Sequence, residues 1–237
     1  MEEFFKQNYS LLNKSVILIA VIASLISYKK YKGTPGFFVI LLIFYLFLID
    51  LLGSYYLIYT KFEFLKPLYY SVFRKNYWWF TLTFDLGVIL FFSVLYQKII
   101  KTLKFKIILK RATILYLCFA IIFIGIKHQE LFRQTFPVLQ ILGALIIILC
   151  CSFYLYELLQ SDSILKMHQD LYFYVTIAIF MWWIIVTPLS FYDLYFKNTD
   201  WNFIILKWQI YLFANIFMYF TFSFALLWCK PNKEKIV

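Results

Sequence analysis

The chain has 237 residues, of which 64% are hydrophobic and 15% are charged, and its mean hydropathy is +0.79. Soluble domains are about half apolar and about a quarter charged, so this composition excludes an ordinary soluble domain and predicts an integral membrane protein. The net charge of +11 requires no nucleic acid partner, because basic residues gather at the cytoplasmic surface of membrane proteins.

Seven apolar segments are long enough, at about 20 residues each, to cross the ~30 Å hydrocarbon core of a bilayer. None alternates over about 10 residues as the strand of a membrane barrel would, so each is predicted to be a helix. We therefore predict an all-α polytopic membrane protein, a seven-helix bundle that forms a single domain over residues 1–237. The predicted spans are residues 11–28, 37–60, 77–97, 108–126, 136–158, 171–193 and 204–228.

Glycine is scarce in this chain and aromatic residues are abundant, with 6 Gly against 29 Phe and 20 Tyr. Small residues normally let transmembrane helices approach one another closely. We therefore expect interlocking aromatic side chains to fill the space between these helices instead.

The segment "QKIIKTLKFKIILKR" lies between the third and fourth spans and predicts the orientation of the chain. Basic segments of this kind prefer the cytoplasmic side, so we expect the N-terminus outside and the C-terminus in the cytoplasm of a bacterial inner membrane. The same residues can contact anionic lipid headgroups or a cytoplasmic signalling partner, although topology alone accounts for their charge. They are Lys98, Lys101, Lys104, Lys106, Lys110 and Arg111.

An aspartate interrupts the second span in "FLIDLLGSYY". At about 1.5 Å of rise per residue, Asp50 lies ~15 Å below the outer end of its span, and Asp85 lies ~12 Å below the outer end of the third. Asn215 on the seventh span reaches a comparable depth, and small polar residues lie one helical turn from each aspartate. The predicted ligand or proton site comprises Asp50, Asp85, Asn215, Ser54, Thr81, Thr187 and Tyr219.

Two interpretations of the aspartates remain open at this point. Ionisable residues inside a membrane are functional by default, as parts of ligand sites or proton pathways. Alternatively, each acid is neutral and hydrogen-bonds a neighbouring Tyr, Ser or Asn, which would simply hold helices together.

The sequence contains no recognised catalytic or metal-binding pattern. His128 and His168 are expected in loops on opposite sides of the membrane, and the four cysteines include no CxxC pair. A structural metal commonly needs four nitrogen or sulfur ligands, and the motifs of serine hydrolases, zinc proteases and nucleotide-binding loops are absent. We therefore predict no catalytic residues, no metal and no cofactor.

The segments "YELLQSDSILKMHQDLYFYVTIAIFMWW" and "NIFMYFTFSFALLWCK" resemble a group of bacterial seven-helix membrane proteins of unassigned function. In that group a span ends in a Leu-Leu pair, a short loop with acidic residues and proline follows, and an aromatic residue opens the sixth span. This chain has "DLYF" where the group has a proline after the Asp. Members of the group occur near signalling proteins such as sensor kinases, so the resemblance, which covers the C-terminal third of the chain, implies a role in signalling.

These features predict a receptor-like sensory or regulatory membrane module with a buried acidic site in the outer half of the bilayer. Such a module would signal through a cytoplasmic or membrane partner. The alternative is a small proton- or cation-coupled transporter or channel, including an oligomeric membrane effector. A third alternative is a lipid-modifying enzyme with an unrecognised site.

Overall fold

A computed structural model of the chain describes residues 2–58, 62–195 and 201–231. All regular structure in these ranges is helical, and seven of the helical segments are long and apolar enough to cross a membrane. The prediction of a multi-pass, seven-helix membrane bundle is therefore confirmed by length and composition. The candidate spans are Asn8–Tyr31, Phe37–Leu57, Tyr77–Ile99, Leu103–Ile126, Pro137–Leu159, Leu171–Phe191 and Phe203–Trp228.

Most spans consist of one long α-helix, and the third is composite. It begins as α4 (Tyr77–Phe80), continues through η4 (Thr81–Val88), which is a π-helix, and ends as α5 (Ile89–Ile99). The remaining long helices are α1 (Glu2–Tyr31), α2 (Phe37–Gly53), α6 (Leu103–Ile126), α7 (Pro137–Leu159), α8 (Leu171–Tyr195) and α9 (Trp201–Trp228). The short segments are η1 (Ser54–Leu57), η2 (Glu63–Leu65), α3 (Lys66–Tyr69), η3 (Val72–Arg74), η5 (Glu130–Phe132) and η6 (Asp162–Gln169).

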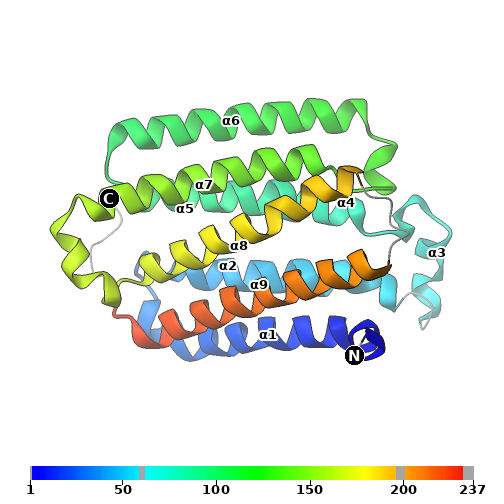
Figure 1. Ribbon diagram of the computed structural model, residues 1–237, viewed down its shortest axis with the longest axis horizontal. Coiled ribbons are helices and arrows are strands. Elements are labelled where there is room, and N and C mark those ends of the chain that lie inside the picture. The colour runs from blue at the N-terminus through cyan, green and yellow to red at the C-terminus, as the bar shows by residue number, and fades with distance from the viewer. Residues whose placement is uncertain (1, 59–61, 196–200, 232–237) are drawn as a thin grey trace.

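The long helices form two layers (Figure 1). In the front layer α6, α7, α8, α9 and α1 pack side by side in this order, so the first and last helices of the chain are neighbours. Behind them α5 packs against α6 and α7, while α2 packs against α1, α4 and η4. Of the seven candidate spans α6 is the least enclosed, with 22% of its most apolar window buried against 39–50% for the others, so it lies at the edge of the bundle.

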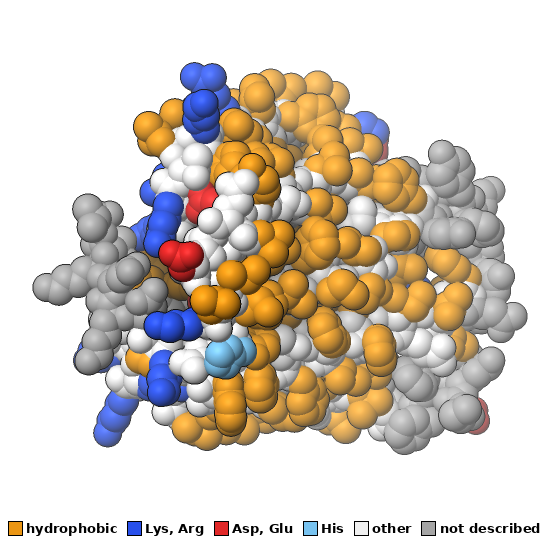
Figure 2. Space-filling model, turned by 60° about the vertical axis from the view of Figure 1, so that its left-hand side comes forward, with side chains coloured by type: hydrophobic (Ala, Val, Ile, Leu, Met, Phe, Trp, Pro, Cys, Tyr) orange, Lys and Arg blue, Asp and Glu red, His pale blue; other side chains and the backbone are white. Residues whose placement is uncertain are grey.

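The two ends of the bundle differ in charge. Lys and Arg side chains gather at the end where α1 finishes and α9 finishes, next to a broad hydrophobic belt (Figure 2). We refer to this end as the basic end and to the other, where α1 begins, as the opposite end. The basic end comprises residues 32–36, 100–102, 160–170 and 229–231, together with the adjoining helix ends.

The basic segment differs from its predicted form, because α6 begins at Leu103 rather than at residue 108. The connection between α5 and α6 is therefore only residues 100–102, and the backbone N–H groups of Lys101 and Thr102 donate to the Glu157 carboxylate at 2.8 and 2.7 Å. Lys and Arg are good helix formers and their long side chains can reach out of the apolar layer, so the helix extends past the apolar segment. Consequently Lys104, Lys106, Lys110 and Arg111 lie on the first turns of a helix and not in a loop.

The second span also ends earlier as an α-helix than its apolar length predicts. The α-helix of α2 stops at Gly53 and continues only as the short η1. Two side chains from the start of the third span satisfy carbonyl groups there: Asn76 Nδ2 donates to Gly53 O at 2.8 Å and Trp79 Nε1 donates to Ile49 O at 2.9 Å. These bonds join the second and third spans at the opposite end.

Aromatic side chains fill much of the space between the helices, as the composition predicts. The rings of Phe105 and Phe153 stack at 4.3 Å between α6 and α7. Phe84 of η4 stacks on Trp183 of α8 at 6.1 Å. Such pairs contribute packing energy beyond their buried area, so they can replace close contacts between small residues.

Candidate functional site

A cavity of about 360 Å³ lies between the two layers of helices. Every span except α6 contributes to its lining. We refer to it as the central cavity. Its polar and acidic lining residues are Asn13, Asp50, Asn76, Asp85, Thr135, Gln140, Ser190 and Asn215.

The central cavity extends from one end of the bundle toward the middle of the membrane. Asn76 and Thr135, which precede α4 and α7, place it at the opposite end. Asn215 and Met218 place its other limit near the middle of α9. The cavity therefore connects one end of the bundle with polar groups near its middle.

Asp85 is held in the π-helical η4, and its exposed fraction is only 3%. The side chain of Gln140 from α7 lies next to its carboxyl group. The hydroxyl group of Tyr116 on α6 donates to the backbone carbonyl oxygen of Asp85 at 2.6 Å. π-Helical turns inside α-helices are frequent at functional sites, because the wider turn redirects the side chains that follow it.

Asp50 lies near the end of α2 and is half-buried. Lys14 of α1 attracts its carboxyl group electrostatically, and the hydroxyl groups of Tyr9 and Tyr219 are close enough to interact with its charge. Among the described residues the ion pairs within 4.0 Å are Lys66–Glu63 and Lys127–Glu130. Neither aspartate of the cavity therefore forms a close ion pair.

Asn215 joins three helices at the inner limit of the cavity. Trp182 Nε1 of α8 donates to Asn215 Oδ1 at 2.7 Å, and Asn215 Nδ2 donates to Asn13 Oδ1 of α1, also at 2.7 Å. This chain of hydrogen bonds connects α8, α9 and α1 inside the bundle. Buried amides without partners would be costly there, so the network fixes the position of this wall.

The structure brings together only some of the residues predicted for the site. Asp50, Asp85, Asn215 and Tyr219 line the central cavity. Ser54, Thr81 and Thr187 do not line it.

The reason lies in how hydroxyl groups bond inside helices. The hydroxyl of Ser54 donates to the backbone carbonyl of Asp50 at 2.7 Å, and that of Thr187 donates to the backbone carbonyl of Trp183. Ser and Thr commonly bond the carbonyl four residues earlier in this way, so a position on the polar face does not provide a free hydroxyl. Thr81 is fully buried and its hydroxyl has no hydrogen-bond partner.

Three amide side chains of the cavity were not identified from the sequence: Asn13, Asn76 and Gln140. Each lies at or near the end of an apolar segment that meets the opposite end of the bundle. A search for every amide in the first turns of these segments would have found them. Lys14, the neighbour of Asp50, lies in the same region of α1 and was also overlooked.

Aromatic rings form much of the remaining wall. Trp182 and Trp183 meet edge to face with their ring centres 5.1 Å apart, and Tyr211 of α9 lies 6.5 Å from Trp182. All three line the central cavity, as does Phe84. The site therefore combines acidic groups with aromatic faces.

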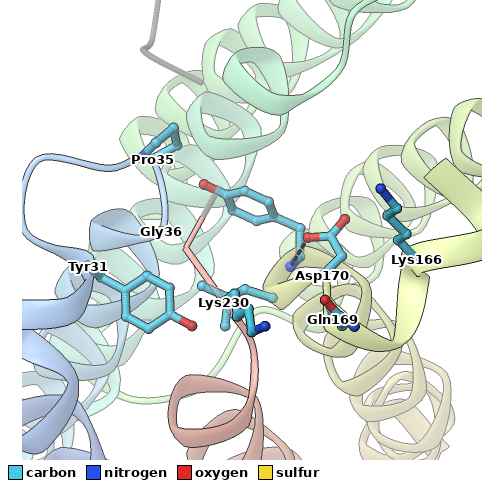
Figure 3. Close-up of a pocket in the computed structure, with 9 residues that line it drawn as sticks. Tyr31, Pro35, Gly36, Lys166, Gln169, Asp170 and Lys230 are labelled. Atoms are coloured by element: carbon cyan, nitrogen blue, oxygen red, sulfur yellow. Dashed lines mark hydrogen bonds between the residues drawn. The ribbon is translucent and has the colours of Figure 1, made fainter. Parts of the chain in front are cut away.

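A second cavity, of about 300 Å³, lies at the basic end (Figure 3). Asp170 accepts hydrogen bonds there from the Tyr154 hydroxyl at 2.7 Å and from the Tyr172 backbone N–H at 2.9 Å. Figure 3 shows Lys230 and Gln169 near Asp170, with Lys166 on the other side of Asp170 in this view. The lining carries both signs of charge, and none of the six basic residues predicted to contact lipid or a partner belongs to it.

The described part of the chain contains no group of three or more His, Cys, Asp and Glu side chains that could hold a metal ion. Comparison with protein-family models, with curated proteins and with solved structures finds no match to this chain.

Proposed function

We propose that the protein is a receptor-like sensory or regulatory module of a bacterial inner membrane, with the central cavity as its ligand site. One observation carries the proposal: one cavity reaches from the opposite end of the bundle toward its middle and is lined by Asp50 and Asp85 together with apolar and aromatic side chains. Its volume lies within the range of small-molecule sites, about 300–1,000 Å³.

Polar and acidic groups inside a membrane are costly and usually serve a function. A purely structural role predicts that such groups satisfy one another, as Asn215 and Asn13 do. The carboxyl groups of Asp50 and Asp85 line a cavity and form no close ion pair among the described residues, and Gln140, the polar neighbour of Asp85, is uncharged. A ligand in the cavity could supply the missing positive charge.

The arrangement of the lining supports a receptor. A ligand in the central cavity would touch every span except α6, so it could favour one packing of the helices over another. A ligand shifts such an equilibrium by its difference in affinity for the two states. In the proposed orientation the N-terminus and the cavity mouth face outside, and the basic end contacts a cytoplasmic partner or anionic lipids through Lys98, Lys101, Lys104, Lys106, Lys110 and Arg111.

Thermal unfolding in lipid nanodiscs tests the ligand site, using a panel of cationic, neutral and anionic small molecules. A ligand that binds only the folded state stabilises it, so at least one compound should raise the Tm of the wild type. Asp85→Asn should abolish that shift. Asp162→Asn, which alters an exposed aspartate at the basic end, should keep it. If no compound raises the Tm, or if Asp85→Asn keeps every shift, the central cavity is not a ligand site.

Hydrogen exchange tests the receptor role. With a binding compound present, exchange should slow around the cavity and also change at residues 100–102 and 160–170, at the basic end. A bound compound that alters exchange only around the cavity would show that occupancy is not transmitted, which would contradict a receptor.

The second candidate is a small transporter coupled to protons or cations. It is favoured by two irregularities beside the cavity: the π-helical η4, which carries Asp85, and Pro188 inside α8, two residues from Ser190. Transporters often place broken or distorted helices at their substrate sites. Uptake into proteoliposomes that depends on a pH or ion gradient, and that is lost in Asp85→Asn, would establish transport and replace the receptor proposal.

A further inference from the structure

We infer that the ligand of the central cavity is a small organic cation, in which a protonated amine is attached to an apolar or aromatic body. This inference rests on the proposed ligand site and specifies its chemistry.

Charge is the first argument. Asp50 and Asp85 both line the cavity, and its lining residues include no Lys, Arg or His. Lys14 attracts Asp50 but does not line the cavity and is not within 4.0 Å of its carboxyl group. Charges removed from water need a partner of opposite sign. An anionic ligand would therefore add to the electrostatic repulsion between the carboxylates of Asp50 and Asp85, whereas a cation would relieve it.

The aromatic wall is the second argument, because it distinguishes an organic cation from a metal ion. Rings of Trp182, Trp183, Tyr211 and Phe84 line the same cavity as the aspartates. Aromatic faces attract ammonium groups, most strongly in desolvated sites, and they pack against apolar bodies. Calcium needs six to eight oxygen ligands, and the described residues contain no cluster of three acidic, His or Cys side chains.

The hydrogen-bond network is the third argument. The Trp182 indole N–H and one amide hydrogen of Asn215 are already used within the wall. The wall between α8, α9 and α1 is thus built before a ligand arrives, so binding there needs little ordering of side chains. Two carboxyl groups remain as the strongest acceptors for the ligand's N–H groups.

Three probes of similar size, which share a phenyl ring, separate the effect of charge from that of the apolar body: phenethylamine, phenethyl alcohol and phenylacetate. Their affinities for the full-length protein in lipid nanodiscs can be measured by calorimetry at neutral pH, where the amine is cationic and phenylacetate is anionic. The amine is expected to bind at least about tenfold more tightly than the alcohol, a difference of about 1.4 kcal/mol. Phenylacetate is expected to bind most weakly.

Variants assign that preference to the aspartates. Asp50→Asn and Asp85→Asn should each weaken amine binding by about tenfold or more, which corresponds to about 1.4 kcal/mol, and should weaken binding of the alcohol much less. Asp162→Asn should leave all three affinities unchanged. A cooperative thermal unfolding transition shows that a variant is folded, so the larger loss of amine binding then reports the charge.

The outcomes separate this inference from the proposed function. Equal affinity for amine and alcohol, tighter binding of phenylacetate, or no binding of the amine at millimolar concentration would each overturn the organic-cation inference. The proposed function would stand in these cases if any compound of the wider panel stabilises the wild type through Asp85. Failure of the whole panel would overturn both.

Discussion

Asn215 illustrates how single residues hold this bundle together. Its amide accepts from Trp182 and donates to Asn13, each at 2.7 Å, so one side chain connects three helices. Inside a bundle of apolar helices such groups find few other partners when one is lost. The contribution of Asn215 to stability should therefore depend on both neighbours.

A double-mutant cycle tests this dependence. Asn13→Ala and Asn215→Ala should each destabilise the protein, and the pair should be non-additive by roughly 0.6–1.7 kcal/mol, the range known for hydrogen bonds between membrane helices. Unfolding in mixed micelles provides the free energies. The matched cycle of Asn13→Ala with Thr221→Ala should be additive, because the Thr221 hydroxyl bonds within its own helix. Additivity in the first cycle would contradict the network.

Gly87 shows a second kind of constraint at the scale of one residue. A Cβ atom at this position would collide with the hydroxyl oxygen of Tyr45, which donates to Thr83 O at 2.8 Å. Gly87→Ala should therefore destabilise the protein by about 1–3 kcal/mol, as overpacking does. Gly125→Ala is the control, since nothing lies within 4 Å of a Cβ there.

Adding Tyr45→Phe to Gly87→Ala removes the colliding atom. This double variant should recover part of the stability lost in Gly87→Ala, as measured by the Tm in nanodiscs. If Gly87→Ala is as stable as the wild type, the close approach of α2 and η4 is not present in the membrane.

Part of the candidate site could be predicted from residue positions alone. The depths of Asp50, Asp85 and Asn215 follow from the fixed rise of a helix, and these three residues line one cavity. The hydrogen-bond partners of the hydroxyl groups could not be predicted. From its position in the sequence, Ser54 could equally bond a carbonyl group of its own helix or a group on a neighbouring helix. The role of Gln140 depends on which helices pack together, and helical spacing within one segment carries no information about that.

At the scale of the helix, the ends are fixed by contacts from other helices. Lys30 of α1 donates through Nζ to the backbone carbonyls of Leu226 and Leu227 of α9, both at 2.9 Å. The last carbonyl groups of a helix lack partners within it, and a cation favours that end of the helix dipole. Lys30 therefore stabilises the end of α9 from a neighbouring helix.

Replacing Lys30 by methionine tests this contact. Hydrogen bonds to charged groups contribute about 1.5–3 kcal/mol, so Lys30→Met should speed amide exchange in the last turn of α9 and lower the Tm. Lys29→Met is the control, since Lys29 is exposed. Equal exchange at the end of α9 in both variants would mean that Lys30 does not cap this helix.

The number of helices could be predicted because about 20 apolar residues are needed to cross a bilayer. The irregular turns within these helices could not be predicted from the sequence. The π-helical η4 has the same apolar character as its surroundings, and it packs against α2 and α7, which spacing within the segment does not reveal. The start of α6 was misplaced because its first turns are basic, so an apolar criterion excluded residues that are good helix formers.

At the scale of the whole molecule, the charge difference between the two ends predicts the orientation in the membrane. Basic residues near the ends of spans are retained on the cytoplasmic side. The basic end should therefore face the cytoplasm, and the central cavity should open on the outer side of the membrane.

Cysteine labelling in intact cells tests this orientation. Glu63→Cys marks the opposite end and Asp162→Cys marks the basic end, and both positions are exposed. In a background without the four native cysteines, a membrane-impermeant thiol reagent should label Glu63→Cys and should label Asp162→Cys only after the cells are opened. The reverse pattern would place the cavity mouth in the cytoplasm and contradict the proposed direction of sensing.

The central claim is that a ligand-accessible cavity reaches Asp85 from the opposite end of the bundle. The most direct measurement is the reaction of Asp85→Cys with a small cationic methanethiosulfonate reagent, added to the outer side of reconstituted vesicles. We predict that Asp85→Cys reacts, whereas Ala178→Cys, at a fully buried position outside the cavity lining, does not react. An unreactive Asp85→Cys, or one that reacts as slowly as Ala178→Cys, would show that the aspartate is sealed inside the bundle and would contradict the account.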